Sequence, residues 1–223
     1  MPAALWDVDG TLVDTAGQHF AAWQELAASI GRPYSRADFD HTFGWRNPEI
    51  LRHLFDPAMT DAECADLGLR KETIYRDMVG AGRVDLLPGV GRLLAEFAAA
   101  GWRQAVGSSA PKGNLDLLLA SAGIGHYFAA VVSGDDVKRG KPAPDVFAQG
   151  AALLDVPAVE CVVLEDAVAG VEAARNAGMA CVAVRSGPHH SAQALRSAGA
   201  GIVVESLDHL HLPEVEALLI SRR

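Results

Sequence analysis

From residue 87 onward, the chain alternates short apolar runs with longer segments of mixed polarity. Each apolar run has the length of a strand, and each segment between two runs is long enough for a helix. The run Cys-Val-Val-Leu at 161–164 is continuously apolar, as expected for a parallel strand that is buried on both faces. The predicted strands cover residues 102–107, 129–133, 161–165, 180–184 and 201–204, preceded by one at residues 4–8.

Glycines mark the ends of the helices that this pattern predicts. A glycine directly after a helical segment is typical of the position where the backbone turns into the left-handed conformation. Because parallel strands need crossover connections, the alternation predicts an α/β fold with a doubly wound parallel sheet, a Rossmann-like core. The glycines are Gly101, Gly123 and Gly178, after helices predicted over residues 90–100, 114–122 and 167–177.

Residues 16–86 depart from this alternation. Their first part has large apolar residues at helical spacing, and the polar segments that follow contain no clear strand. We therefore predict a helical cap domain over residues 16–86, inserted into a catalytic core of residues 1–15 and 87–223, with linkers near residues 14–17 and 85–89. The apolar positions are Phe20, Trp23, Leu26, Ala27 and Ile30.

Composition narrows the classes of partner. The 223 residues are 50% hydrophobic, carry a formal net charge of −9 and contain no cluster of lysine and arginine, so we expect neither a nucleic-acid partner nor a membrane span. The widely spaced Cys64, Cys161 and Cys181 predict neither a disulfide framework nor a zinc site. The N-terminus has no signal-peptide pattern. A cytoplasmic protein that acts on a small molecule is expected, as a monomer or a weak homodimer.

Two aspartates, Asp7 and Asp9, directly follow the first predicted strand. Open α/β sheets bind ligands at the carboxyl ends of their strands, so this pair is expected beside the binding crevice. Burial of two like charges there requires a cation or a shared proton. The alternative is a surface turn in which Asp-Gly makes local Asx hydrogen bonds.

A second acidic pair, Glu165 and Asp166, closes the predicted strand at 161–165. The carboxyl ends of parallel strands meet at one edge of the sheet, so four carboxylates are expected to converge there. Oxygen ligands with no histidine or cysteine nearby favour an octahedral Mg²⁺. The alternative is that Asp166 caps the helix that follows.

Two further segments place polar groups where predicted elements meet. Ser108 and Ser109 end a strand and precede a helix, where a hydroxyl and backbone N–H groups can hold phosphate oxygens; ordinary serine capping is the alternative. Lys141 precedes Pro142 and Pro144, which restrict the backbone and so fix the direction of one ammonium group. A solvated loop lysine is the alternative there.

Taken in order, Asp-x-Asp-Gly-Thr, Gly-Ser-Ser, Lys-Pro-Ala-Pro-Asp and Glu-Asp resemble the four motifs of the haloacid dehalogenase-like superfamily of phosphotransferases. The resemblance covers nearly the whole chain, and the helical segment after the first motif is similar to that superfamily's cap. It implies a two-step phosphoryl transfer in which Asp7 is the nucleophile and Asp9 the general acid and base. The residues that it implies for Mg²⁺ are Asp7, Asp9 (through its backbone carbonyl), Glu165 and Asp166, and those for the phosphoryl group are Ser108, Ser109 and Lys141.

Within the cap, the segment 14–23 is similar to β-phosphoglucomutases and related sugar-phosphate phosphatases, which carry a histidine and an Ala-Trp pair there. The similarity implies that His19 orients the catalytic acid Asp9 and that Thr15 lies at the hinge. It also implies that Lys71 contacts the sugar. Exposed positions on helix faces are the alternative for His19 and Lys71.

The segment Gly-Trp-Arg-Asn-Pro at 44–48 stands where the mutases have a loop with an arginine, so Arg46 and Asn47 are expected at the substrate, with Arg46 offset by one position. A surface position is the alternative for Arg46. The mutases also hold the remote phosphate of a bisphosphate with a Ser-Lys-Asn run after the second motif. Here Ala110 and Pro111 stand in that place and lack the donors. The expected function is therefore Mg²⁺-dependent hydrolysis of a small phosphate monoester, such as a sugar or polyol phosphate.

Other functions stay open on the residues alone. A phosphomutase of the β-phosphoglucomutase type would pass the phosphoryl group to a second sugar hydroxyl. A haloacid dehalogenase would use the same nucleophile without needing Glu165 and Asp166. A non-catalytic binding relative would be expected to lose one of the acidic motifs, and all of them are present.

Overall fold

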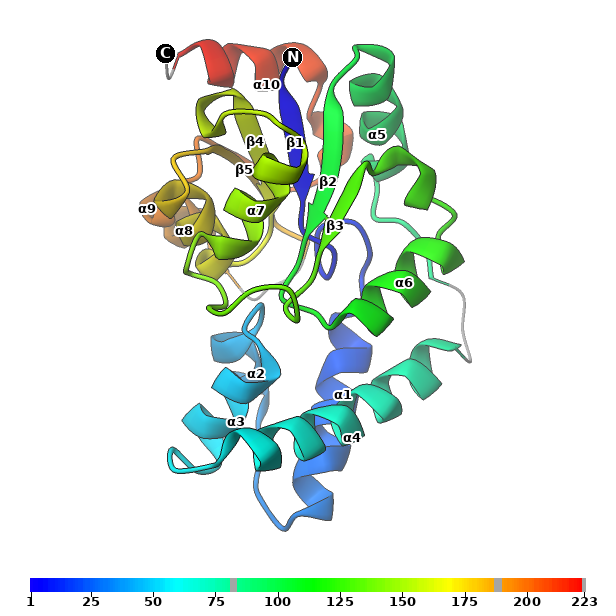
Figure 1. Ribbon diagram of the computed structural model, residues 1–223, viewed down its shortest axis with the longest axis vertical. Coiled ribbons are helices and arrows are strands. Elements are labelled where there is room, and N and C mark those ends of the chain that lie inside the picture. Colours follow the sequence, from blue (N-terminus) through cyan, green and yellow to red (C-terminus); the bar gives the residue numbers. More distant parts are fainter. Residues whose placement is uncertain (81–83, 187–189, 222–223) are drawn as a thin grey trace.

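The computed structural model describes residues 1–80, 84–186 and 190–221. It has two parts, a sheet with helices on both faces and a group of helices below the sheet as drawn in Figure 1. The first strand begins, and the last helix lies, at the end of the sheet that is remote from the helical group. The carboxyl end of the first strand faces that group. Side chains that follow the central strands can therefore meet side chains from the helices.

In the described ranges, six parallel strands form one sheet in the order β3-β2-β1-β4-β5-β6. Every strand predicted from the sequence is present, with small shifts at the ends, which confirms the doubly wound α/β core. The strand order reverses between β1 and β4, and such a reversal opens a crevice at the carboxyl ends of the two strands. The strands are β1 Ala3–Trp6, β2 Arg103–Gly107, β3 Ala130–Val132, β4 Cys161–Glu165, β5 Ala180–Val184 and β6 Ile202–Val204.

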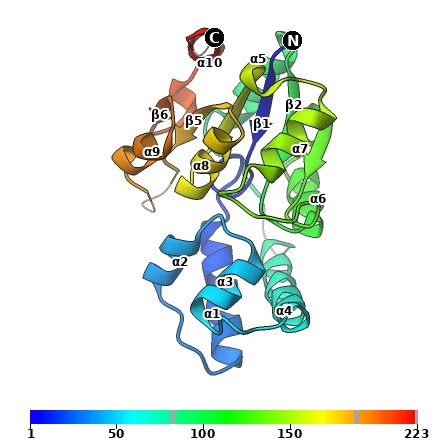
Figure 2. The same cartoon turned by 60° about the vertical axis from the view of Figure 1, so that its left-hand side comes forward.

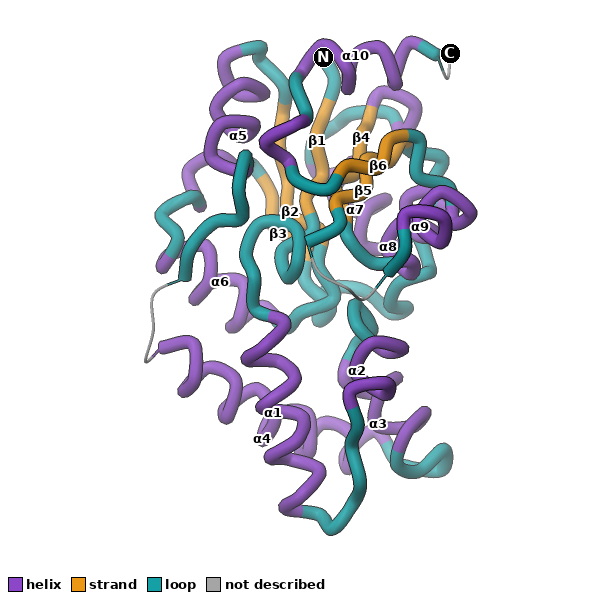
Figure 3. The backbone as a smooth tube through the Cα atoms, turned by 180° about the vertical axis from the view of Figure 1, so that it is seen from behind, coloured by secondary structure: helices purple, strands orange, loops and turns teal. Residues whose placement is uncertain are grey.

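Helices cover both faces of the sheet because successive side chains of a strand point to opposite faces. Ala4 and Trp6 of β1 belong to a hydrophobic cluster with α5, α6 and α10. Ala3 and Leu5 belong to a second cluster with α7, α8 and α9. Figures 2 and 3 show these two layers from different sides. The helices are α5 Val90–Ala99, α6 Lys112–Ser121, α7 Asp145–Leu153, α8 Val168–Asn176, α9 Ala192–Ala198 and α10 Leu212–Ile220.

The predicted helix ends are confirmed by the backbone. Gly101, Gly123 and Gly178 lie two residues beyond the ends of α5, α6 and α8, with φ of 76°, 70° and 75°. Three short 3₁₀ turns complete the regular structure of the core. They cover Gly125–Tyr127, Ala158–Glu160 and Leu207–His209.

A group of four helices, called the cap below, forms the second part. In residues 16–80 the described chain contains helices, turns and loops but no strand, as predicted. Trp23 of α1, Phe39 of α2 and Leu51 of α3 pack in a third hydrophobic cluster, which consists of cap residues and Ala167 of the core. The helices are α1 Ala16–Ser29, α2 Arg36–Thr42, α3 Asn47–Leu54 and α4 Asp61–Gly80.

The core segments that flank the cap, at residues 12–13 and 86–87, lie side by side. Leu87 N donates to Leu12 O at 2.9 Å, and Val13 forms an antiparallel bridge with Leu86. The exact domain boundaries, after residues 15 and 86, stay a prediction. Within the described ranges, no helix combines the length and the apolar character needed to cross a membrane.

Candidate active site

The motif residues lie at one edge of the sheet, at the carboxyl ends of the central strands. Asp7 directly follows β1, and Glu165 is the last residue of the neighbouring β4, with Trp6 and Leu164 paired in register. Ser108 follows β2 on the other side of β1, and its N–H donates to Val132 O at 3.1 Å. The parallel register therefore places these three residues at the crevice that faces the cap.

Three buried carboxylates cluster at this edge. Asp7, Glu165 and Asp166 each place a carboxylate oxygen within 4.8 Å of the other two. Lys141 is 3% exposed, and its Nζ donates to Asp7 Oδ1 at 2.6 Å and to Glu165 Oε1 at 2.7 Å. Burial excludes the two alternatives of a solvated lysine and a surface Asp-Gly turn. One ammonium group thus faces three carboxylates.

The electrostatics of the cluster reflect this excess of negative charge. Burial raises the pKa of Asp7 to about 7, with Lys141 acting in the opposite direction and Glu165 adding to the rise. Burial, helped by the Glu165 and Asp7 carboxylates, also raises the pKa of Asp166 well above its ordinary value. For Lys141, burial disfavours the charged form, but the two adjacent carboxylates raise its pKa overall. A further cation beside Asp7 and Asp166 would stabilise both ionised groups.

The donor set fits Mg²⁺. All ligand atoms on offer are carboxylate oxygens, which this ion prefers. Among the described residues, the Asp166 carboxylate has only long hydrogen bonds, from Thr11 Oγ1 at 3.4 Å and Ser186 Oγ at 3.5 Å. Gly10 leaves it room, because a Cβ there would lie 2.1 Å from Asp166 Oδ2. Asp166 is therefore held loosely enough to bind a cation.

The helix-cap alternative for Asp166 is wrong. The first helical residue of α8 is Val168, and no side chain of the preceding residue caps the helix. The backbone N–H groups of Asp166 and Ala167 instead donate to Glu165 Oε2, both at 2.7 Å. Glu165 thus fixes the turn before α8 with one oxygen and contacts Lys141 with the other, while Asp166 stays available.

Asp9 lies in a different environment from Asp7, although only one residue separates them. Its Oδ1 accepts hydrogen bonds from the Thr15 hydroxyl, from His19 Nε2 at 3.0 Å and, at 3.4 Å, from Tyr75 Oη. Burial alone would raise the pKa of Asp9, but His19, the hydrogen bond from Thr15 and the nearby Lys71 lower it to about 2. Helices α1 and α4 of the cap therefore fix the position and charge of this carboxylate.

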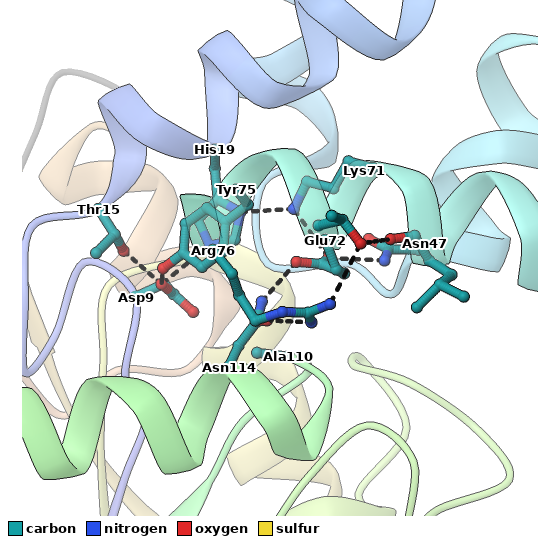
Figure 4. Close-up of polar contacts among 12 residues, drawn as sticks. Asp9, Thr15, His19, Asn47, Lys71, Glu72, Tyr75, Arg76, Ala110 and Asn114 are labelled. Atoms are coloured by element: carbon teal, nitrogen blue, oxygen red, sulfur yellow. Dashed lines mark hydrogen bonds and ion pairs between the residues drawn. The ribbon is translucent and has the colours of Figure 1, made fainter. Parts of the chain in front are cut away.

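A chain of hydrogen bonds continues from Asp9 into the cap, as Figure 4 shows. Lys71 Nζ lies 2.7 Å from His19 Nδ1 and donates to Glu72 Oε1 at 2.9 Å. An ammonium group only donates, so Nδ1 is the acceptor and the proton of His19 is on Nε2, directed at Asp9. The ring of Tyr75 stacks on His19 with centroids 3.9 Å apart. These contacts exclude exposed positions for His19 and Lys71.

Glu72 and Asn114 belong to this network, and the sequence interpretation missed both. Glu72 is 3% exposed and accepts from Asn47 Nδ2 at 2.7 Å and from Asn114 Nδ2 at 2.5 Å. Arg76 in turn donates to Asn114 Oδ1 at 3.2 Å. The spacing of four residues that places Lys71 with Tyr75, and Glu72 with Arg76, on one helix face was the available signal. Asn114 on α6 offered none.

One pocket between core and cap brings most of the predicted site residues together. Asp7 and Asp9 line it with Ser108 and Ser109, and Ser109 Oγ has no hydrogen-bond partner within the described chain. Ser108 Oγ accepts from Ala110 N at 3.1 Å, so it also acts as a local cap. The cap contributes His19, Asn47 and Lys71, together with the aromatic residues Trp23, Tyr34, Phe39, Phe43 and Trp45.

Two of the predicted substrate residues do not line this pocket. Thr15 acts on Asp9 instead, through its hydroxyl. Arg46 Nη1 donates to the carbonyl oxygens of Val137 at 3.2 Å and Lys138 at 3.0 Å, so its guanidinium faces a loop of the core. The direction of Arg46 depends on how the cap sits on the core, which the local sequence does not encode.

The part of the chain that matches a known family contains the residues that form this site. A family model described as haloacid dehalogenase-like hydrolase matches residues 1–178, which include the cap and every motif. The chain belongs to the haloacid dehalogenase-like hydrolase family. The resemblance inferred from the motifs is thereby confirmed.

Relatives within this family include both mutases and phosphatases. The β-phosphoglucomutase of Bacillus subtilis (strain 168) is 34% identical over 193 residues, with 84% of each chain covered. Fructose-1-phosphate phosphatase YqaB of Escherichia coli (strain K12) is 35% identical over 185 residues, which cover 81% of this chain and 95% of YqaB. The crystal structure of CbbY from Rhodobacter sphaeroides in complex with phosphate has a TM-score of 0.84 at 28% identity, covering 97% of this chain and 100% of CbbY.

Proposed function

We propose that the protein is a Mg²⁺-dependent phosphatase that transfers the phosphoryl group of a small sugar or polyol monophosphate to water. The observation that carries this proposal is the contrast between two aspartates that line one pocket. Asp7 is held by Lys141 within a carboxylate cluster, whereas Asp9 is held by Thr15 at the hinge and by His19 of the cap. The first arrangement suits a nucleophile and the second suits a proton carrier.

The chemistry proceeds in two steps. A carboxylate oxygen of Asp7 attacks phosphorus in line, the bond from phosphorus to the leaving oxygen breaks, and that oxygen takes a proton from Asp9. In the second step Asp9 takes a proton from a water molecule, which attacks the phosphorus of the aspartyl-phosphate. Inorganic phosphate leaves and the Asp7 carboxylate is restored. Lys141, the Ser108 hydroxyl and the backbone N–H of Ser109 are assigned to the charge on the phosphoryl oxygens.

Mg²⁺ would be held by the carboxylates of Asp7 and Asp166 and the backbone carbonyl of Asp9, with Glu165 beside them, and it would neutralise the phosphoryl oxygens. Asp9 is ionised before substrate binds, since its pKa is about 2. A phosphate group that enters beside it raises this pKa by like-charge repulsion, which favours the protonated form needed in the first step. His19 keeps the carboxylate oriented in both steps.

The small number of positively charged side chains that line the pocket favours hydrolysis over a mutase reaction. Lys71 is the one lysine or arginine among the described residues that line it, and its ammonium group already contacts Glu72 and His19. The Glu72 carboxylate adds a negative charge, and Ala110 and Pro111 supply no side-chain donors. A second phosphate group would therefore meet little positive charge there. YqaB, named a fructose-1-phosphate phosphatase, is consistent with such a substrate.

The choice between phosphatase and mutase has a direct test. Incubated with Mg²⁺ and a panel of sugar and polyol monophosphates, the protein is expected to release inorganic phosphate as its main product. With β-glucose 1-phosphate, phosphate should appear at least as fast as glucose 6-phosphate. Much faster conversion to glucose 6-phosphate, dependent on a bisphosphate primer, would instead establish the phosphomutase alternative.

Substitution of Lys71 tests whether the cap contacts the sugar of the substrate. Lys71→Ala is expected to lower kcat/KM on the best sugar phosphate roughly 10- to 10²-fold more than on p-nitrophenyl phosphate, the scale of one hydrogen bond to a charged group. The reason is that cap contacts act through the body of the leaving group. Lys112→Ala removes an exposed lysine paired with Asp116 and is the control. Equal losses on both substrates would mean that Lys71 does not contact the sugar.

A further inference from the structure

Lys141, which contacts the carboxylate cluster, is the last residue of a loop at residues 137–141. Lys141 must place one ammonium group between Asp7 and Glu165, and both distances are at the short end of charge-assisted hydrogen bonds. The loop lies on the side of the core that faces the cap and contacts the start of α3. Whatever fixes its backbone also fixes the Lys141 side chain, because the lysine is the last residue of this segment.

The first turn of the cap helix α3 holds this loop by three hydrogen bonds. Arg46 Nη1 donates to the carbonyl oxygens of Val137 and Lys138, at 3.2 and 3.0 Å. Gly140 N donates to Glu49 Oε1 at 3.2 Å, and Glu49 Oε2 accepts from Arg46 N at 3.1 Å. The Glu49 carboxylate thus joins the start of α3 to the residue directly before Lys141.

The contact is so close that a side chain at residue 140 would displace the side chains of Arg46 and Glu49. A Cβ on Gly140 would lie 2.6 Å from Glu49 Oε2 and 2.7 Å from Arg46 Cδ. The φ of Gly140 is not positive, so its backbone conformation is open to any residue. Alanine at this position would therefore disturb the contact with α3 rather than the local backbone. The absence of a side chain at Gly140 therefore leaves space for α3 of the cap to contact the loop.

We propose that Arg46 and Glu49 are positioning residues for Lys141, through which the cap fixes the loop at residues 137–141 when it sits on the core. Neither residue lines the pocket that contains Asp7 and Asp9, so they act on the loop and not on the substrate. This inference rests on the proposed function for its kinetic readout. If Arg46 and Glu49 position Lys141, loss of either side chain impairs phosphoryl transfer with every leaving group. In this they differ from Lys71, whose loss is expected to depend on the leaving group.

The kinetic test compares Arg46→Ala and Gly140→Ala with Arg52→Ala. Arg52 is on the same helix but contacts Met59 O and the exposed Asp61 within the cap, which makes it a matched control. Arg46→Ala and Gly140→Ala are expected to lower kcat roughly 10- to 10²-fold, the cost of a small misplacement of a catalytic group, and by the same factor on p-nitrophenyl phosphate and on the best sugar phosphate. Arg46→Lys should recover part of the loss, since one ammonium group can donate to both carbonyl oxygens.

The contrary kinetic results are specific. A loss on the sugar phosphate alone would mean that Arg46 contacts the substrate, and a kcat like that of Arg52→Ala would mean that Lys141 is placed without the cap. Either result overturns the inference.

Hydrogen exchange gives a second readout that does not depend on turnover. The amides of residues 138–141 are expected to exchange faster in Arg46→Ala than in Arg52→Ala, while amides of β1 and β4 keep their protection. Unchanged exchange in the loop would contradict the proposed contact. If the wild-type protein hydrolysed no phosphate ester, the proposed function would fail, and the exchange result would still decide whether Arg46 holds the loop.

Discussion

Asp7→Asn is expected to abolish turnover on every phosphate ester that the wild-type protein hydrolyses. An amide has the shape of the carboxylate but is not a nucleophile, so no aspartyl-phosphate can form. The expected loss in kcat is on the order of 10⁵-fold or more, the scale on which enzymes lose activity when their nucleophile is removed. The measurement is phosphate release with Mg²⁺ at saturating substrate.

The fold of this variant should be retained. The introduced asparagine would keep a side-chain oxygen that can accept from Lys141 Nζ, the partner of the wild-type carboxylate at 2.6 Å. The thermal unfolding midpoint of the variant should therefore stay near that of the wild type, which separates loss of chemistry from loss of structure. Substantial phosphate release by a well-folded Asp7→Asn protein would remove Asp7 from its assigned role.

Removal of divalent cations is expected to have the second largest effect. The buried carboxylates of Asp7, Glu165 and Asp166 face one ammonium group, and burial without a further cation raises the pKa of Asp7 to about 7. Exhaustive treatment with a chelator should therefore reduce phosphate release to background, and added Mg²⁺ should restore it. The same chelator saturated with Mg²⁺ beforehand should have no effect.

Asp166→Asn connects this effect to the carboxylate cluster. The variant should need at least roughly tenfold more Mg²⁺ for half of its maximal activity, because it loses one charged ligand. Asp116→Asn removes an exposed carboxylate that is paired with Lys112 and serves as the control for net charge. Full release of phosphate after exhaustive chelation would contradict a role for a divalent cation in the reaction.

Much of the core and its motif residues could be predicted because both depend on local patterns. Continuous apolar runs indicate parallel strands, and Asp7 and Glu165 directly follow or end two of them. Once the strands are parallel and adjacent, their last residues must meet. The doubly wound parallel sheet, the helix-ending glycines and the helical character of residues 16–80 agree with the sequence for the same reason.

The parts that sequence reasoning did not reach depend on contacts between core and cap. No role was predicted for Glu72 from the sequence, yet it is buried between Asn47 and Asn114, the latter 42 residues away. Arg46 was expected at the substrate and faces the carbonyl oxygens of Val137 and Lys138, more than 90 residues on. No periodicity or short motif specifies how core and cap meet, so these partners become visible only in three dimensions.

The most direct test of the account is the covalent intermediate on Asp7. In Asp9→Asn, p-nitrophenyl phosphate should still phosphorylate the enzyme, because nitrophenolate leaves without a proton, whereas hydrolysis lacks its base. One equivalent of nitrophenolate per enzyme should appear in a burst. Peptide mass spectrometry after acid quenching should then locate one phosphoryl group on Asp7. A phosphoryl group on any other residue, or a burst of nitrophenolate with no phosphorylated peptide, would contradict the account.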